Sequence, residues 1–158
     1  MIEKRIAEIK RLADADRLDE ASAAVQAFVA EFPGQAEAWR YRAYVLALRG
    51  QHRDAVKDMT SAIGLNSREP HYYWTRGKYL LDLGDNEAAI KDLTETLRLC
   101  DEHSSDYYRE AAHLLRAEAY LRLGRPEEAR RDCESVSDNA TIWAGSIRSK
   151  EAILADCK

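Results

Sequence analysis

The sequence predicts an all-α fold, an α-solenoid of four helical hairpins followed by a C-terminal capping helix. The main support is an internal repeat: DRLDEA (Asp16–Ala21), GQHRDA (Gly50–Ala55) and GDNEAA (Gly84–Ala89) follow one another at an offset of 34 residues. A fourth copy, GRPEEA (Gly124–Ala129), follows after 40 residues, and every copy ends on alanine. A period of this length with a small residue at a fixed slot is typical of antiparallel helix pairs that stack into an array.

The composition is that of an ordinary globular protein. Apolar residues make up 46% of the 158 residues, enough for the core of one domain, which we expect to cover residues 1–158. The net charge of −4 and the scattered Lys and Arg residues argue against nucleic-acid binding. No apolar run of signal-peptide or membrane-spanning length is visible, so we expect a cytoplasmic protein without a membrane partner. Three widely spaced cysteines favour a reducing compartment over a disulfide framework.

Glycine and proline divide the chain into hairpins of an A helix and a B helix. Gly50, Gly84 and Gly124 should end A helices, because glycine adopts the left-handed conformation at the least cost. Pro33 and Pro70 fall at hairpin boundaries, which suits a residue that cannot continue a helix. We expect the first repeat over residues 2–35, with helices at about 2–13 and 18–31, and the second over 36–69, with helices at about 36–49 and 52–65.

The third and fourth repeats are separated by an insertion. Six residues, Asp101–Asp106, interrupt the period, and Ser104 or Ser105 within them could cap a helix. We therefore expect a longer fourth A helix that projects beyond its neighbours. Pro126 should occupy the first turn of the last B helix, where its missing N–H is harmless. We expect the third repeat over 70–109 and the fourth over 110–139, with helices at about 70–83, 86–99, 105–123 and 126–136.

The segment after the fourth repeat has no second hairpin. We expect one amphipathic helix at about 141–156, capped by Asp138 or Asn139, that covers the apolar face of the last repeat. Its apolar stripe consists of Ile142, Trp143, Ile147, Ile153 and Leu154.

On these residues the chain resembles the tetratricopeptide repeat (TPR) family. That family favours a large aromatic, a small residue, a second large residue, glycine and alanine at fixed positions of each repeat, and the first repeat here matches least, with Ala21 and Pro33 in place. The resemblance implies a right-handed superhelix whose small residues let paired helices approach closely. The matching residues are Trp39, Ala43, Leu46, Gly50 and Ala55 in repeat two, Tyr73, Gly77, Leu80, Gly84 and Ala89 in repeat three, and His113, Ala117, Tyr120, Gly124 and Ala129 in repeat four.

Aromatic residues gather in the A helices of repeats two and three. Seven of them fall there, and repeat packing needs only Trp39, Tyr73 and Tyr79. The resemblance implies that A helices line a concave groove, which would be aromatic and basic at its centre. Tyr, Trp and Arg also dominate binding hot spots. The predicted partner-binding residues are Arg40, Tyr41, Tyr44, Leu48, His71, Trp74, Lys78 and Leu81, with Ile6 and Lys10 added by repeat one and Leu114 and Glu118 by repeat four.

The sequence contains no recognisable site for catalysis, a cofactor or a metal. It has no phosphate-binding Gly-rich loop, no nucleophile elbow and no helical His pair for zinc. His113 and Cys133 take large or apolar repeat positions and should pack in the core, whereas Cys157 should be accessible. The carboxylate clamp of co-chaperone TPR domains is excluded, because Tyr44 and Thr75 stand where the resemblance would require Asn.

Three functions remain open. The favoured one is a non-catalytic interaction module, an adaptor or scaffold that binds an acidic or apolar protein or peptide segment on the concave A-helix surface. The second is narrower, because the chain is similar in outline to small bacterial TPR proteins that neutralise or hold one partner, such as toxin-immunity proteins and secretion chaperones. The third, an enzyme, is least favoured, since no acid, base and nucleophile come together in the pattern.

Overall fold

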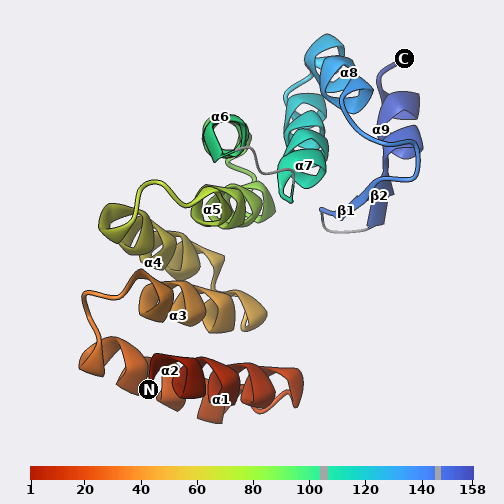
Figure 1. Cartoon of the computed structure of the whole chain (residues 1–158). Helices are drawn as coiled ribbons and strands as arrows, with labels where there is room; N and C mark the ends of the chain where they lie inside the picture. Colours follow the sequence, from red (N-terminus) through yellow and green to blue (C-terminus); the bar gives the residue numbers. More distant parts are fainter. Residues whose placement is uncertain (104–106, 145–146) are drawn as a thin grey trace. The chain divides into compact units, whose positions relative to one another are not determined.

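The structure, a computed structural model, describes residues 1–103, 107–144 and 147–158, apart from the side chains of Trp143 and Ile147 (Figure 1). Within these residues the chain forms helices joined by short turns, and one small hairpin of strands near the C-terminus. The elements are α1 (Ile2–Asp14), α2 (Leu18–Glu31), α3 (Ala36–Leu48), α4 (His52–Leu65), α5 (Pro70–Asp82), α6 (Asn86–His103), α7 (Arg109–Arg122), α8 (Pro126–Glu134), β1 (Thr141–Trp143), β2 (Ile147–Ser149) and α9 (Lys150–Asp156).

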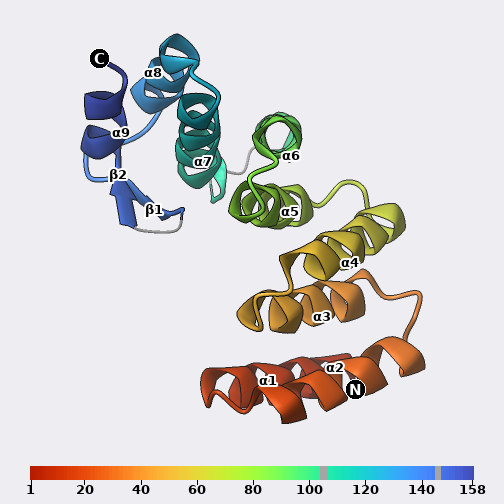
Figure 2. The same cartoon turned by 180° about the vertical axis from the view of Figure 1, so that it is seen from behind.

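The chain divides into two compact units, Met1–Arg68 and Glu69–Lys158. The first contains the hairpins α1–α2 and α3–α4, and α2 also packs against α3. Its core includes Ile9 and Phe28, both fully buried. The second contains the hairpins α5–α6 and α7–α8 and the C-terminal elements, as both views show (Figure 2). The paired helices agree with the predicted repeats; that the chain forms one domain stays a prediction.

Left-handed residues end the A helices, as the sequence predicts. Gly50, Gly84 and Gly124 have φ values of 75°, 80° and 69°. In the second repeat the N–H of Gln51 reaches back to the carbonyl of Leu46 at 2.9 Å and so closes the helix end. The first repeat has Asp16 in this slot, with a φ of 56°. Asp is among the few residues that tolerate this conformation, so the turn is kept without glycine.

Small residues bring the paired helices close together. The alanine that ends each sequence copy is fully buried in all four repeats, at Ala21, Ala55, Ala89 and Ala129. Gly77 of α5 lies so near α6 that a Cβ placed on it would meet Cγ of Leu93 at 3.1 Å. A larger side chain at these slots would have to separate the helices, which confirms the predicted role of the small residues.

A buried ion pair recurs in three of the repeats and joins each A helix to its own B helix. Arg76 donates from Nε and Nη2 to the two carboxylate oxygens of Asp92 at 2.7 and 2.8 Å. The equivalent pairs are Arg42 with Asp58, at 2.7 and 2.8 Å, and Arg116 with Asp132, at 2.8 and 2.6 Å. The first repeat has Glu8 and Ala24 at these two positions.

The insertion lengthens a different helix from the one predicted. The fourth A helix begins at Arg109 rather than near residue 105, and the extra turn extends the preceding B helix to His103. Leu99 and Cys100 are fully buried, so packing carries α6 past the predicted end at residue 99. The proposed N-caps Ser104 and Ser105 lie outside the described residues.

The C-terminal segment does not form one helix over 141–156. Its first part is an antiparallel strand pair in which Ile142 faces Arg148, and helix begins only at Lys150. The sequence Thr-Ile-Trp favours a strand, because β-branched and aromatic residues pack well there. Ser149, instead of Asp138 or Asn139, caps α9 by accepting a hydrogen bond from the N–H of Ala152 at 3.1 Å.

The C-terminal elements nevertheless cover the last repeat. Helix α9 packs against α7 and α8, and β1 packs against α7. Ile142 and Ile153 of the predicted stripe are buried, whereas the side chains of Trp143 and Ile147 lie outside the described part. Cys157 is only 3% exposed, and its Sγ donates to the carbonyl of Ile153, so the predicted accessibility of this thiol is wrong.

Candidate functional site

In the first unit, the predicted binding residues of α3 differ widely in exposure. Leu48 is 46% exposed and Tyr44 is half-buried, so both can reach a partner. Tyr41 is 8% exposed and belongs to the core, and Arg40 lies with its guanidinium 4.0 Å above the ring of Tyr41. This part of the A-helix face therefore offers Tyr44 and Leu48 rather than Tyr41.

The charge of Arg40 is matched within its own helix. Glu37, one turn earlier, accepts two hydrogen bonds from Nε and one from Nη2 at 2.6 to 3.1 Å. Burial of Arg40 acts against its charged form, yet the bonds to Glu37 prevail and raise the pKa of the guanidinium. The predicted excess of positive charge at this position is accordingly neutralised.

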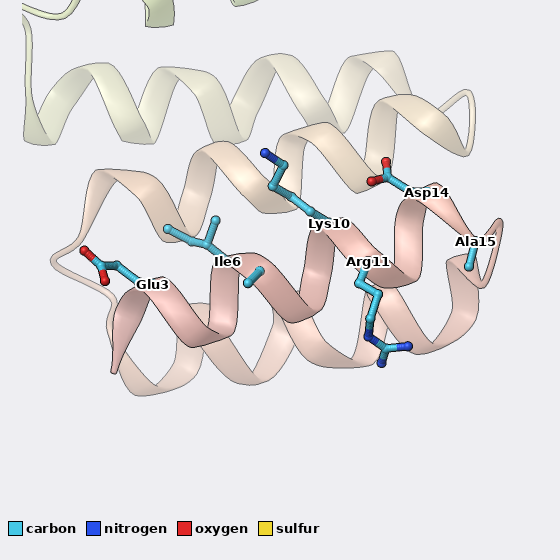
Figure 3. Close-up of a pocket in the computed structure, with 7 residues that line it drawn as sticks. Glu3, Ile6, Lys10, Arg11, Asp14 and Ala15 are labelled. Atoms are coloured by element: carbon cyan, nitrogen blue, oxygen red, sulfur yellow. The ribbon is translucent and has the colours of Figure 1, made fainter.

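Helix α1 continues the A-helix face of the first unit with an open depression of about 720 Å³ (Figure 3). Ile6, which lines the depression, and Tyr44 both pack against the core cluster of the first unit. Burial raises the pKa of Tyr44, and the nearby charge of Asp14 adds to this effect. The depression is lined by Glu3, Ile6, Ala7, Lys10, Arg11, Asp14 and Ala15.

In the second unit, the predicted residues of α5 again divide into exposed and buried ones. His71, Trp74 and Lys78 are half-buried, whereas Leu81 is 1% exposed and unavailable to a partner. Lys78 lies 3.6 Å from the carboxylate of Asp82, so its charge too is matched one turn away. Leu114 and Glu118 of the fourth repeat are buried, because the C-terminal elements cover α7 and Glu118 binds Arg148 at 3.1 Å.

His71 and Trp74 form an aromatic cluster with Tyr107 and Tyr108, which immediately precede α7. The ring of Tyr108 stacks on His71 at 5.0 Å with an interplanar angle of 14°, and lies 5.5 Å from Trp74. Tyr107 meets Tyr108 edge-on at 4.7 Å and is itself 83% exposed. The sequence did not predict this cluster, because Tyr107 and Tyr108 are distant in the chain from His71 and Trp74.

The remaining ionisable groups of interest are structural. Nδ1 of His113 lies 2.8 Å from Asp132, which also pairs with Arg116. Burial of Asp132 opposes ionisation, but the hydrogen bonds from Arg116 and His113 outweigh it and lower the pKa of this carboxyl. Burial raises the pKa of Cys133 to about 11, so its thiol is unreactive at neutral pH. The described ranges contain no group of three or more His, Cys, Asp and Glu side chains able to hold a metal ion.

Among the residues that the structure describes, none of the helices combines the length and the apolarity needed to cross a lipid bilayer.

Comparison with known proteins identifies the repeats. A family profile described as "Tetratricopeptide repeat" matches residues 6–70, 49–104 and 75–139. The chain is also 28% identical over 125 residues to DnaJ homolog subfamily C member 3 of Mus musculus, and this match covers 75% of the chain and 25% of the mouse protein. The chain thus spans about a quarter of that relative's length.

Solved structures share the fold at low identity. MamA from Desulfovibrio magneticus has a TM-score of 0.74 at 15% identity, with 85% of this chain and 72% of that chain covered. PilF from Pseudomonas aeruginosa has a TM-score of 0.75 at 17% identity, with 84% and 58% covered. Kinesin light chain TPR-like repeats from Podospora anserina have a TM-score of 0.75 at 16% identity, with 84% and 71% covered. These likenesses confirm the predicted all-α solenoid class.

Proposed function

The chain belongs to the tetratricopeptide repeat family, and from this premise we propose that it is a non-catalytic module that binds a segment of a partner protein on the faces of its A helices. The family fold itself supports a role in protein–protein interaction. The observation that carries the choice of surface is the exposure of large side chains in each unit: Leu48 is 46% exposed and Tyr44 half-buried in the first, and in the second Trp74 is half-buried and Tyr107, just ahead of α7, is 83% exposed. Exposed apolar side chains of this size mark interaction surfaces when they occur together.

The charges on this surface favour an apolar segment over an acidic one. Arg40 is paired with Glu37 and Lys78 with Asp82, so neither cation offers a full unmatched charge to an acidic partner. An acidic segment would have to compete with these carboxylates for the same cations. Apolar and aromatic contacts should therefore supply most of the affinity, and the paired charges should mainly affect orientation.

Site-specific photo-crosslinking in an extract of the source cells tests the proposal. A photoreactive phenylalanine at Tyr44 or Trp74 should capture a partner, because these side chains lie on the A-helix face. The same group at Thr60 or Lys91, which are exposed on B helices, should capture little and serves as the matched control. Equal capture at A-helix and B-helix positions would remove the A-helix face from consideration.

The same experiment addresses the narrower role as an immunity protein or chaperone for one toxin or effector. That role would appear as one dominant partner in equimolar complex, whereas an adaptor or scaffold would yield several. In a pull-down without the photoreactive group, Tyr44→Ala combined with Trp74→Ala should abolish partner capture while the helical circular dichroism stays unchanged. A folded double variant that still captures its partner in full would contradict the proposed surface.

A further inference from the structure

We propose that the aromatic cluster of His71, Trp74, Tyr107 and Tyr108 binds an extended, proline-containing segment of the partner. This inference rests on the proposed function and narrows the ligand at one part of its surface. The cluster includes Tyr107 and Tyr108, which lie between the inserted residues and α7, and the ring of Tyr108 packs against His71 and Trp74 of α5. It is therefore a feature of this chain rather than of the 34-residue repeat.

The packing of the rings determines how a ligand can approach them. Tyr108 is in contact with three other rings of the cluster, at centroid distances of 4.7 to 5.5 Å. Since the rings fill the space between one another, a cation cannot be enclosed among them as in an aromatic cage. A ligand must lie across their outer surface, where Tyr107 is 83% exposed. The flat ring of proline suits contact with such a surface, and a polyproline II segment is already extended before it binds.

The cluster also contains a hydrogen-bond donor without a partner. Nε1 of Trp74 is covered from solvent and has no acceptor in the part of the chain that the structure describes. A buried N–H in this state is costly, and a carbonyl oxygen that reached it would recover that cost. Proline-rich segments present carbonyl acceptors with few N–H donors. The carbonyl reaches Nε1 of Trp74 after a rotation of side chains around it, among which His71 and Tyr108 contact the Trp74 ring, and rotations of this kind are common on binding.

The charges near the cluster point to a neutral ligand. Arg109 pairs with Asp101 at 2.6 Å, and Lys78 lies 3.6 Å from Asp82. The carboxylate of Glu69 accepts a hydrogen bond from the backbone N–H of His71 at 3.2 Å. Arg109 and Lys78 are thus each matched by a carboxylate, so neither offers an unmatched positive charge that would select an acidic segment. Ring contact and a carbonyl acceptor remain as the basis of recognition.

The test is a titration of the ¹⁵N-labelled full chain with a capped oligoproline of about ten residues, a length that forms a stable polyproline II helix. The indole N–H resonance of Trp74, assigned through Trp74→Phe, should move downfield and saturate. The indole of Trp39 is the internal control, because it already donates to the carbonyl of Pro33 at 2.8 Å and should not move. Trp74→Phe, which keeps a ring but removes the donor, should weaken binding about tenfold. Tyr107→Ala should weaken it about three- to tenfold.

Tyr107 is so exposed that its replacement should leave the fold intact, which circular dichroism verifies. The inference is overturned if oligoproline leaves the Trp74 resonance in place, if an alanine-based helix or a poly-glutamate peptide moves it equally, or if both variants bind oligoproline like the wild type. Should cross-links from Tyr44 and Trp74 persist after any of these results, the proposed function stands and only the ligand class is wrong. Loss of those cross-links as well would refute both the proposed function and the proposed ligand class.

Discussion

Replacing Arg76 by methionine should lower the free energy of unfolding by about 2–3 kcal/mol. The substitution keeps an unbranched side chain but removes both hydrogen bonds to Asp92, whose side chain is only 8% exposed. A buried carboxylate that loses its partner costs about 3–5 kcal/mol. The side chain of Arg76 is itself 20% exposed, so water can partly replace it, and we take a value below that range.

Urea unfolding followed by helical circular dichroism at neutral pH measures this loss. Arg98→Met is the matched control, since Arg98 likewise binds both carboxylate oxygens of one residue, Glu95, and in addition Glu102, but on an exposed surface. It should leave the unfolding midpoint nearly unchanged, because water screens such pairs. Combining Arg76→Met with Asp92→Leu should recover most of the lost stability, since no charge is then left buried without a partner.

Two results would refute this account of the recurring ion pair. One is a midpoint for Arg76→Met equal to that of Arg98→Met, which would mean that the buried pair contributes no more than an exposed one. The other is a double variant no more stable than Arg76→Met alone, which would mean that the lost stability comes from the packing of Arg76 rather than from an unpaired Asp92.

Further predictions concern titration, packing, turns and the C-terminus. The folded pKa of Asp132 lies below its unfolded value, so ionised Asp132 stabilises the fold above about pH 4 and loses this effect as the pH falls through the folded pKa. The difference in unfolding free energy between the wild type and Asp132→Asn, measured by urea unfolding, should therefore shrink below about pH 4. Ala89→Leu, at a fully buried helix contact, should cost about 1–3 kcal/mol by the same assay. Gly84→Ala should cost about 1–2 kcal/mol because of its φ of 80°, whereas Gly64→Ala, in helix with open space around it, should be neutral or stabilising. Deleting residues 141–158 should cause aggregation in gel filtration, as it uncovers α7 and α8, and a monomeric truncated chain would contradict the capping role.

The surface that we propose for binding was only partly predictable from the sequence. The repeat positions that line the groove in the TPR family predicted side chains on A helices, and four of these have exposed area: Tyr44, Leu48, His71 and Trp74. The same positions also gave Tyr41 and Leu81, which are buried. A repeat position fixes the side of the helix on which a residue lies. It does not fix whether the neighbouring side chains cover that residue.

The sequence by itself determined the repeats, the A and B helices and the turns between them. These features depend on spacings within a few residues: apolar periodicity, a glycine or Asp16 at the left-handed position, and an alanine at each close approach. The Arg–Asp pairs also carried a sequence signal, because Arg42, Arg76 and Arg116 recur in step with the repeats. That signal does not reveal that the partner carboxylates are buried.

Only the tertiary structure decided the parts that join distant residues. It extended α6 to His103, formed strands at Thr141–Trp143 and Ile147–Ser149 where a helix was expected, and put Tyr108 against His71. Helix and strand propensities of short segments are weak, and packing overrides them wherever a buried face is available. The pairing of Lys78 with Asp82, in contrast, joins residues four apart on one helix, and their spacing already indicated it.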